Sequence, residues 1–374
     1  MKLGIPAETR SNETRVAATP ETVKKLTASG HHAVVIQAGA GMGSSIPDDQ
    51  FTAAGASIAA SAAEIYQQAD IVLKVRVPDA PELAQMRSGQ VLIGLLSPHH
   101  KDGIAALAKQ GVTAFAMEAL PRISRAQNMD VLSSQANLGG YKAVMMAANA
   151  YRRLMPMLMT AAGTVKAARV VIMGVGVAGL QAIATAKRLG AVVEATDVRP
   201  ETKEQVESLG AKFIEVPLTE AEKELAKGQG GYAREMGEEY RKRQAALVAE
   251  RIKQADVVIT TALIPGRPAP VLVTEDMVKS MRPGSVIVDM AVEQGGNCPL
   301  SELDKTVVKH GVTIIGIANL PALVAADASA LYARNLLNFL GLMLDAKTGE
   351  FKINREDEII AGTLMCVDGE MVKK

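Results

Sequence analysis

The sequence predicts an α/β protein made of two Rossmann-like, doubly wound parallel-sheet domains that are joined by long helices. Short apolar runs of strand length alternate with segments of helical periodicity along the whole chain, which is the pattern of βαβ units. These runs fall into two sets, separated by a long segment rich in Ala, Met and Leu. At 374 residues, the chain is long enough for about two domains with cores of their own.

Each set of apolar runs predicts one sheet. The runs of the first set are Leu3 to Ile5, Val34 to Ile36, Ile71 to Val75, Val91 to Leu96 and Thr113 to Ala116. The runs of the second set are Val170 to Met173, Val192 to Thr196, Lys212 to Val216, Val257 to Thr260, Val286 to Asp289 and Thr313 to Ile317. Continuous apolar runs are typical of strands that helices cover on both faces, so we expect both sheets to be mainly parallel.

Two long helices are expected to join the sheets. They are predicted over Asn137 to Met159 and over Ala322 to Leu344, from their high content of Ala, Leu and Met. The tail beyond the second helix is expected to return to the first sheet. We therefore expect a discontinuous first domain of residues 1–136 plus 322–374, and a second domain of residues 137–321.

The segment from Arg169 to Arg199 has the features of a dinucleotide-binding unit. A predicted strand leads directly into the pattern GxGxxG, which consists of Gly174, Val175, Gly176, Val177, Ala178 and Gly179. The first glycine allows a tight turn, the second lets the backbone approach a pyrophosphate, and the third lets helix and strand pack closely. The pyrophosphate then lies at a helix N-terminus, where free N–H groups and the helix dipole favour anions.

The elements after this turn complete the unit. A helix is predicted from the spacing of Leu180, Ile183 and Leu189, and Gly190 marks its end. The next apolar strand ends in Asp197, about twenty residues beyond the turn, where an acidic side chain accepts hydrogen bonds from the adenosine ribose. NAD is therefore the leading ligand.

Composition excludes several other classes. No apolar stretch approaches the ~18 residues of a membrane span, and the N-terminus has no apolar signal run, so the cytoplasm is expected. The two cysteines form no CxxC pair and the five histidines have no acid or cysteine at ligand spacing, so no metal site is expected. Lys and Arg number 41 against 40 for Asp and Glu, without a basic stripe, and no nucleic-acid partner is expected.

Three segments outside the fingerprint each allow two readings. The cluster Gly39, Gly41 and Gly43 follows a strand, but its GxGxG spacing is more typical of a turn than of a nucleotide site. The charged stretch 219–244 is longer than a normal connection, which indicates either a mobile lid or disorder. The polar loop from Pro121 to Gln135 is either part of a site or a capped helix start.

Long motifs in these segments resemble the NAD(H)-binding component of the proton-translocating nicotinamide nucleotide transhydrogenases. They include PRISRAQNMDVLSSQANLGGYKAV, GVGVAGLQAIATAKRLGA, GGYAREM, TTALIPGRPAPVL and GSVIVDMAVEQGGNC. The resemblance runs nearly end to end. It implies a homodimer that binds NAD(H) and docks on an NADP(H)-binding component and on a membrane-spanning proton-channel component. Hydride would pass directly between the two nicotinamides, with the chain peripheral on the inner membrane.

The resemblance also assigns site residues. Four polar residues match a loop near the nicotinamide and form the expected catalytic set: Arg122, Gln127, Asp130 and Ser133. Within this set, Arg122 and Asp130 would hold the carboxamide region, and Gln127 would reach toward the NADP(H) partner. The other expected cofactor contacts, besides the six residues of the glycine turn, are Asp197, Val198, Arg199, Gly231, Tyr232, Met236, Gln244 and Leu263. Tyr232 and Met236 match a mobile loop that closes over NAD(H).

Two alternative functions remain open. The N-terminal pattern MKLGIPAETRSNETRVAATPETV also resembles alanine dehydrogenase, which oxidises L-alanine with NAD. That enzyme uses a lysine and a histidine, and this chain has Arg76 and Ser97 at those positions, with His99 and His100 close by. The arginine that would bind a substrate carboxylate, Arg15, is retained. The other alternative is a non-catalytic, NAD-responsive regulatory protein.

Overall fold

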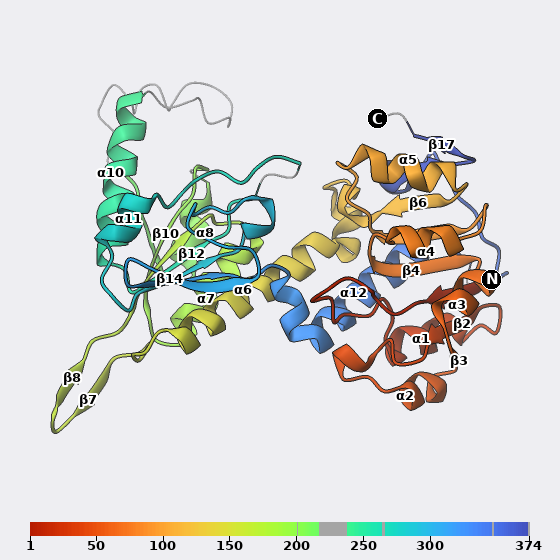
Figure 1. The fold of residues 1–374 in the computed structure, drawn as a ribbon, viewed down its shortest axis with the longest axis horizontal. Helices are drawn as coiled ribbons and strands as arrows, with labels where there is room; N and C mark the ends of the chain where they lie inside the picture. The colour runs from red at the N-terminus through yellow and green to blue at the C-terminus, as the bar shows by residue number, and fades with distance from the viewer. Residues whose placement is uncertain (200, 217–237, 264–265, 346–347, 373–374) are drawn as a thin grey trace. The chain divides into compact units, whose positions relative to one another are not determined.

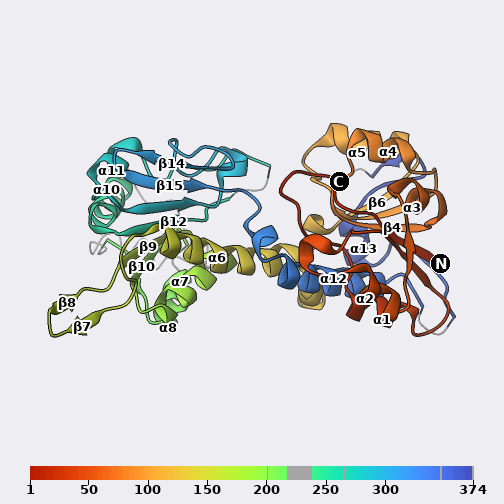
Figure 2. The same ribbon diagram turned by 60° about the horizontal axis from the view of Figure 1, so that its bottom comes forward.

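The computed structural model describes residues 1–199, 201–216, 238–263, 266–345 and 348–372. The chain divides into two compact units, of which the first is Met1–Gln135 with Pro321–Lys374 and the second is Ala136–Leu320. Each unit contains one main sheet with helices packed on it, as Figure 1 and Figure 2 show. The prediction of an α/β protein with two mainly parallel sheets is confirmed.

The described residues of the first unit form an eight-stranded sheet in the order β17-β16-β6-β5-β4-β1-β2-β3. Its strands are β1 (Lys2–Ile5), β2 (Ala33–Gln37), β3 (Ser57–Ala59), β4 (Ile71–Arg76), β5 (Val91–Leu95), β6 (Thr113–Ala116), β16 (Leu364–Val367) and β17 (Glu370–Met371). The strands from β6 to β3 run parallel, whereas β16 pairs antiparallel with β6. The C-terminal tail therefore completes the sheet that the N-terminal part begins.

Helices cover both faces of this sheet. They are α1 (Pro20–Thr27), α2 (Asp48–Ala53), α3 (Ala62–Gln68), α4 (Ala80–Gln85), α5 (Lys101–Lys109), α12 (Ala325–Leu340) and α13 (Glu358–Thr363). Alternate strand residues face opposite sides. Thus Ile71 and Leu73 pack in one apolar cluster with Tyr332 of α12, while Val72 packs in another with Ile104 of α5.

The described residues of the second unit form a seven-stranded sheet in the order β11-β10-β9-β12-β13-β15-β14. Its strands are β9 (Arg169–Met173), β10 (Val192–Thr196), β11 (Lys212–Phe213), β12 (Val257–Thr260), β13 (Val286–Asp289), β14 (Lys305–Lys309) and β15 (Val312–Gly316). All neighbours are parallel except β14 and β15. The chain builds outward from β9 through β10 and β11 and then returns to β12, so the topological switch point lies between β9 and β12.

The second sheet is also covered on both faces. Its helices are α6 (Val131–Ala150), which begins in the first unit, α7 (Val177–Arg188), α8 (Thr202–Ser208), α10 (Glu238–Gln254) and α11 (Glu275–Ser280). One apolar cluster joins residues of α6, α7 and α8 to strand residues such as Ile172, and the other joins α10 and α11 to strand residues such as Val171. This arrangement is a doubly wound sheet.

The two long helices are shorter than predicted. Helix α6 begins earlier, at Val131, because the carboxylate of Asp130 accepts a hydrogen bond from the Ser133 N–H at 2.9 Å and caps the helix. It ends at Ala150, and the chain then reaches Pro156, whose ring and missing N–H are incompatible with a continuing helix. Helix α12 ends at Leu340, so its predicted extension to Leu344 was wrong.

Two further segments differ from the predictions. The predicted helix end became strand β7 (Leu158–Thr160), which pairs with β8 (Gly163–Val165) in a hairpin that projects from the second unit (Figure 1, Figure 2). Of the predicted loop 219–244, residues 238–244 belong to α10, whereas residues 219–237 lie outside the described residues. Among the helices in the described part of the chain, none is long and apolar enough to cross a membrane.

Candidate functional site

The glycine turn after β9 requires glycine at two of its positions. Gly174 has a φ of 97°, and a Cβ there would lie 2.5 Å from the hydroxyl oxygen of Thr261. A Cβ at Gly179 would lie 2.0 Å from the carbonyl oxygen of Gly174, so the start of α7 packs directly on the turn. A Cβ at Gly176 would meet no described atom within 4 Å. The middle of the turn is therefore open to a ligand.

The N-terminus of α7 is held in place from its other side by α6. A Cβ at Gly140 of α6 would lie 2.1 Å from the carbonyl oxygen of Ala178, so these two helices are in backbone contact. The N-cap residue Gly176 and the first helical residue Val177 are both exposed. Unpaired N–H groups at such a terminus, together with the helix dipole, make an anion-binding site.

Asp197 lies immediately after β10, and its side chain is bonded to the glycine turn. One carboxylate oxygen accepts a hydrogen bond from the Val175 N–H at 2.7 Å, and Arg199 adds side-chain bonds of 2.9 and 3.0 Å. Burial raises the pKa of Asp197, but the bonds from Arg199 and Val175 outweigh burial and leave the pKa below its ordinary value. The carboxylate therefore stays ionised at neutral pH. The Arg199 side chain is half exposed, so it can move away from the carboxylate.

The other expected cofactor contacts differ in where the structure places them. Gln244 of α10 donates to the Thr196 hydroxyl at 3.3 Å, directly beside the end of β10. Val198 is 92% exposed and Leu263 is 46% exposed, so neither is part of the apolar core. Three of the expected contacts, Gly231, Tyr232 and Met236, lie outside the described residues.

The polar loop of the first unit starts a helix. Asp130 and Ser133 form the cap of α6, and the Ser133 hydroxyl donates to Asp130 at 2.5 Å. The side chains of Arg122 and Gln127 are exposed. The capped-helix reading therefore accounts for two of the four residues in the expected catalytic set, and it leaves two polar side chains directed to solvent.

A buried charge cluster engages Arg15, the residue that would bind a substrate carboxylate in alanine dehydrogenase. Its guanidinium donates to both carboxylate oxygens of Glu13, at 2.7 and 2.6 Å, and to Gln135 at 2.8 Å. Arg76 donates to the same carboxylate at 3.0 Å. Burial raises the pKa of Glu13, but the two arginines lower it further, to about 2. Arg15 and Arg76 thus share one internal counter-ion.

Neither a lysine nor a histidine is available for amino-acid chemistry at the matching positions. The backbone N–H of Ser97, at the histidine position, donates to Glu118 at 2.6 Å. His99 and His100 are both exposed. Lys74 is fully buried and donates to Glu82 at 2.6 Å.

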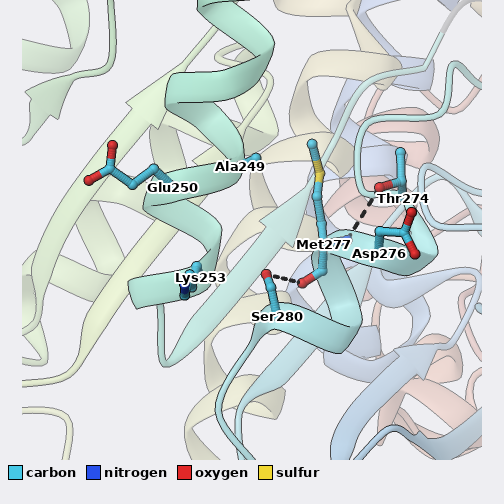
Figure 3. Close-up of a pocket in the computed structure, with 7 residues that line it drawn as sticks. All are labelled: Ala249, Glu250, Lys253, Thr274, Asp276, Met277 and Ser280. Atoms are coloured by element: carbon cyan, nitrogen blue, oxygen red, sulfur yellow. Dashed lines mark hydrogen bonds between the residues drawn. The ribbon is translucent and has the colours of Figure 1, made fainter.

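A pocket of about 430 Å³ lies between α10 and α11 (Figure 3). Its lining is Ala249, Glu250, Lys253, Thr274, Asp276, Met277 and Ser280. The two hydrogen bonds drawn there are a helix cap from Met277 N–H to Thr274 and a bond from the Ser280 hydroxyl to the Met277 carbonyl. Both hydrogen bonds lie within α11 and its N-cap. No residue of the expected sites lines the pocket.

The fold and the glycine turn define a doubly wound α/β protein whose described residues include a glycine turn of the dinucleotide-binding type. Two family models match the chain: Alanine dehydrogenase/PNT, N-terminal domain, over residues 4–139, and Alanine dehydrogenase/PNT, C-terminal domain, over residues 143–374. The chain therefore belongs to the alanine dehydrogenase/PNT family.

Individual relatives narrow this assignment. The first part of NAD(P) transhydrogenase subunit alpha from Rhodospirillum rubrum is 57% identical over 380 residues, which are 100% of this chain and 98% of the relative. The crystal structure of transhydrogenase from Sinorhizobium meliloti superposes with a TM-score of 0.90 at 52% identity and covers 100% of both chains. Alanine dehydrogenase of Mycolicibacterium smegmatis is 31% identical over 382 residues, which are 100% of this chain and 95% of the relative. The predicted assignment to the NAD(P) transhydrogenase alpha component is confirmed.

Several residues that shape this site were not predicted from the sequence. Thr261 donates to the Gly174 carbonyl at 2.9 Å, and Gly140 permits the contact of α6 with α7. An isolated glycine within a helical pattern is a signal of close packing, and Gly140 carries that signal. Nothing local marks Thr261, because Gly174, which it binds, is distant in sequence. The buried Glu13 lies two residues from its partner Arg15, but its second partner, Arg76, is distant in sequence.

Replacing Glu13 by Gln is expected to lower the free energy of unfolding by about 3–5 kcal/mol at pH 7, because the buried Arg15 would lose its counter-charge. The pKa of Glu13 in the fold is about 2, below its value of about 4.3 in an unfolded chain. Its stabilisation is therefore present above about pH 4 and is lost as the pH falls toward 2. Urea unfolding followed by circular dichroism from pH 7 down to pH 3 measures this.

Glu21→Gln is the matched control, because Glu21 also pairs with an arginine, Arg334, but at an exposed site. Exposed pairs contribute about 1 kcal/mol or less. Equal losses in the two variants would contradict the importance of the buried cluster.

Proposed function

We propose that this chain holds NAD(H) in its second unit and exchanges hydride directly with NADP(H) held by a separate component. A membrane-spanning partner would couple the exchange to proton translocation. The observation that carries the proposal is the open N-terminus of α7 at the topological switch point, beside the carboxylate of Asp197. Doubly wound sheets bind dinucleotides at this place.

The described residues suit a reaction that depends on positioning. A nicotinamide ring carries the hydride itself, so the protein supplies binding, orientation and electrostatics. The N–H groups at the start of α7 would bind the pyrophosphate, and Asp197 would bind the adenosine ribose once Arg199 moves aside. Arg122 and Asp130 are proposed to orient the carboxamide region, with Ser133 holding Asp130 and Gln127 facing the NADP(H) partner. Ring-to-ring transfer needs no proton abstraction from a substrate.

The identity of the partners is supported by the relatives. The Rhodospirillum rubrum protein is named as the first part of an alpha subunit, which indicates further components. We propose that this chain likewise docks on an NADP(H)-binding component and on a membrane-spanning proton-channel component. It would then lie on the cytoplasmic side, peripheral on the inner membrane.

Amino-acid oxidation is the weaker candidate. The chain is 31% identical to an alanine dehydrogenase. However, Arg15 is closed off by Glu13 inside the first unit, and Arg76 binds the same carboxylate instead of offering a titratable amine. A substrate carboxylate would have to displace a buried ion pair.

A homodimer is proposed to use the β7–β8 hairpin. A lone two-stranded hairpin is marginally stable in water. Met157, Leu158 and Met159 on this one are exposed by 58%, 45% and 70%. Contiguous exposed apolar residues mark interaction sites, and a second copy offers a matching surface by two-fold symmetry.

Wild-type protein is expected to bind NADH more tightly than NADPH, because the Asp197 carboxylate repels a 2′-phosphate. Asp197→Ala should weaken NADH binding about tenfold, or about 1.4 kcal/mol. Arg199→Ala should instead widen the preference for NADH, since it removes the cation that neutralises Asp197. Isothermal titration calorimetry measures both. Similar dissociation constants of the wild-type protein for the two nucleotides would contradict the role of Asp197.

Hydride transfer from NADH to NADP⁺ is expected only after an NADP(H)-binding component is added to the chain. Gln127→Asn should slow this transfer far more than it weakens NADH binding, because a shorter side chain disturbs the partner side and leaves the pyrophosphate contacts intact. Gln50→Asn, at another exposed glutamine of the first unit, should change neither. Rates are followed by nucleotide absorbance.

If Gln127→Asn weakened NADH binding as much as it slowed hydride transfer, Gln127 would be an ordinary cofactor-binding residue. Rapid oxidation of L-alanine by the isolated chain would favour the alanine dehydrogenase reading over the proposed one.

Met159→Glu is expected to convert the dimer to a monomer, because a charge would be buried without a partner at the apolar hairpin. Light scattering coupled to size-exclusion chromatography measures the mass. Met42→Glu is the control, since Met42 is also 60% exposed but lies in the first unit. A monomeric wild type, or a variant that remains dimeric, would refute the hairpin interface.

A further inference from the structure

Two buried polar side chains, Asp289 and Asn297, tie the loop after β13 to the segment after β12. Both side chains are 0% exposed. The carboxylate of Asp289 accepts hydrogen bonds from the N–H groups of Ala291, Asn297 and Cys298 at 3.0 to 3.1 Å, and from the Ser301 hydroxyl at 2.7 Å. This one carboxylate therefore sets the path of the loop.

The loop path needs glycine where it passes Asp289. Gly295 and Gly296 have φ angles of 95° and 82°, which favour glycine. A Cβ at Gly296 would lie 2.6 Å from a carboxylate oxygen of Asp289. The two glycines therefore let the chain fold back over the carboxylate and deliver Asn297 into the interior.

Asn297 uses its whole amide on the segment after β12. Its oxygen accepts a bond from the Ala262 N–H at 3.1 Å, and its nitrogen donates to the carbonyl oxygens of Ala262 and Pro270, both at 2.8 Å. The backbone carbonyl of Asn297 accepts bonds from Leu272 and Val273 at 2.8 and 3.0 Å. The Asn297 side chain thus gives Ala262 hydrogen bonds of the kind that a neighbouring strand supplies.

The segment after β12 is held from both sides by different residues. On the side of β9, Thr261 is anchored by its N–H to the Met173 carbonyl at 2.9 Å and by its hydroxyl to the Gly174 carbonyl at 2.9 Å. On the side of β13, Asn297 holds Ala262. Removing the Asn297 amide should therefore free Ala262 and leave the glycine turn anchored.

We infer that Asn297, fixed by Asp289, is a positioning residue for the nicotinamide half of the bound dinucleotide. The inference rests on the proposed NAD(H) site in the second unit. In a doubly wound sheet the first βαβ half, here β9 and β10, takes the adenosine half, and the strands beyond the switch point take the other half. Ala262 lies at the carboxyl end of β12, the first strand beyond that point.

The test compares NADH with ADP, which carries the adenosine and pyrophosphate but no nicotinamide. In Asn297→Ala, the dissociation constant for NADH should rise about tenfold, while that for ADP should change less than about twofold. Isothermal titration calorimetry on the full chain measures both constants. If Asn297→Ala does not fold, Asn297→Ser carries the test with the same expected direction, because its hydroxyl leaves one polar partner in place.

Gln90→Ala is the matched control, since the buried amide of Gln90 also accepts one backbone N–H and donates to two backbone carbonyls, in the first unit. It should lower the melting temperature as Asn297→Ala does, yet leave the ratio of the NADH and ADP constants unchanged. Equal weakening of NADH and ADP in the Asn297 variants would overturn the positioning role. A wild-type chain that binds neither nucleotide would instead overturn the proposed NAD(H) site, and the positioning role with it.

Discussion

The close approach of three backbone segments at the start of α7 is the constraint on which the second unit depends. A side chain at Gly179 would strike the Gly174 carbonyl, and one at Gly140 would strike the Ala178 carbonyl, at 2.0 and 2.1 Å. The helix terminus is therefore wedged between the turn after β9 and helix α6. Its N–H groups and dipole are fixed before any anion arrives, and such preorganisation lowers the entropic penalty of binding.

The two units differ in how their charged and polar groups find partners. In the first unit, Lys74 and Arg15 are buried against carboxylates from the same unit, so their charges are already neutralised. In the second unit, the exposed start of α7 keeps its donors available, while the buried carboxylate of Asp289 is satisfied by the chain itself. The buried ion pairs of the first unit confer little net stability, but removing one partner of such a pair is strongly destabilising. The first unit thus contains buried charges that are paired internally, whereas the second has an exposed helix start at the proposed nucleotide site.

In the second unit, side-chain hydrogen bonds fix the path of a loop in the way that backbone hydrogen bonds fix a strand. In the described part of the segment after β12, Asn297 supplies Ala262 with hydrogen bonds of the kind that a neighbouring strand supplies. Buried backbone groups must find partners, and here a side chain from a distant loop provides them. Asp289 plays the same part for the loop itself. The backbone at this edge of the sheet is therefore hydrogen-bonded to side chains on both sides of the switch point.

Local sequence was enough to predict most of the strands, the glycine turn and the family, whereas strands β3, β14, β16 and β17 were not predicted. Strands β10, β12 and β13 have the predicted bounds, because continuous apolar runs can be buried only between two layers of helices. The helix bounds were decided by single contacts, such as the capping bond at Asp130, and the β7–β8 hairpin followed from the early end of α6. The tertiary fold was needed to pair Arg15 with Gln135 and Arg76 with Glu13, to engage Asp197 with Val175 and to bring Asn297 to Ala262. The periodicity of apolar residues indicates which residues are buried. The partner of a buried polar group, in contrast, depends on how distant segments meet in space.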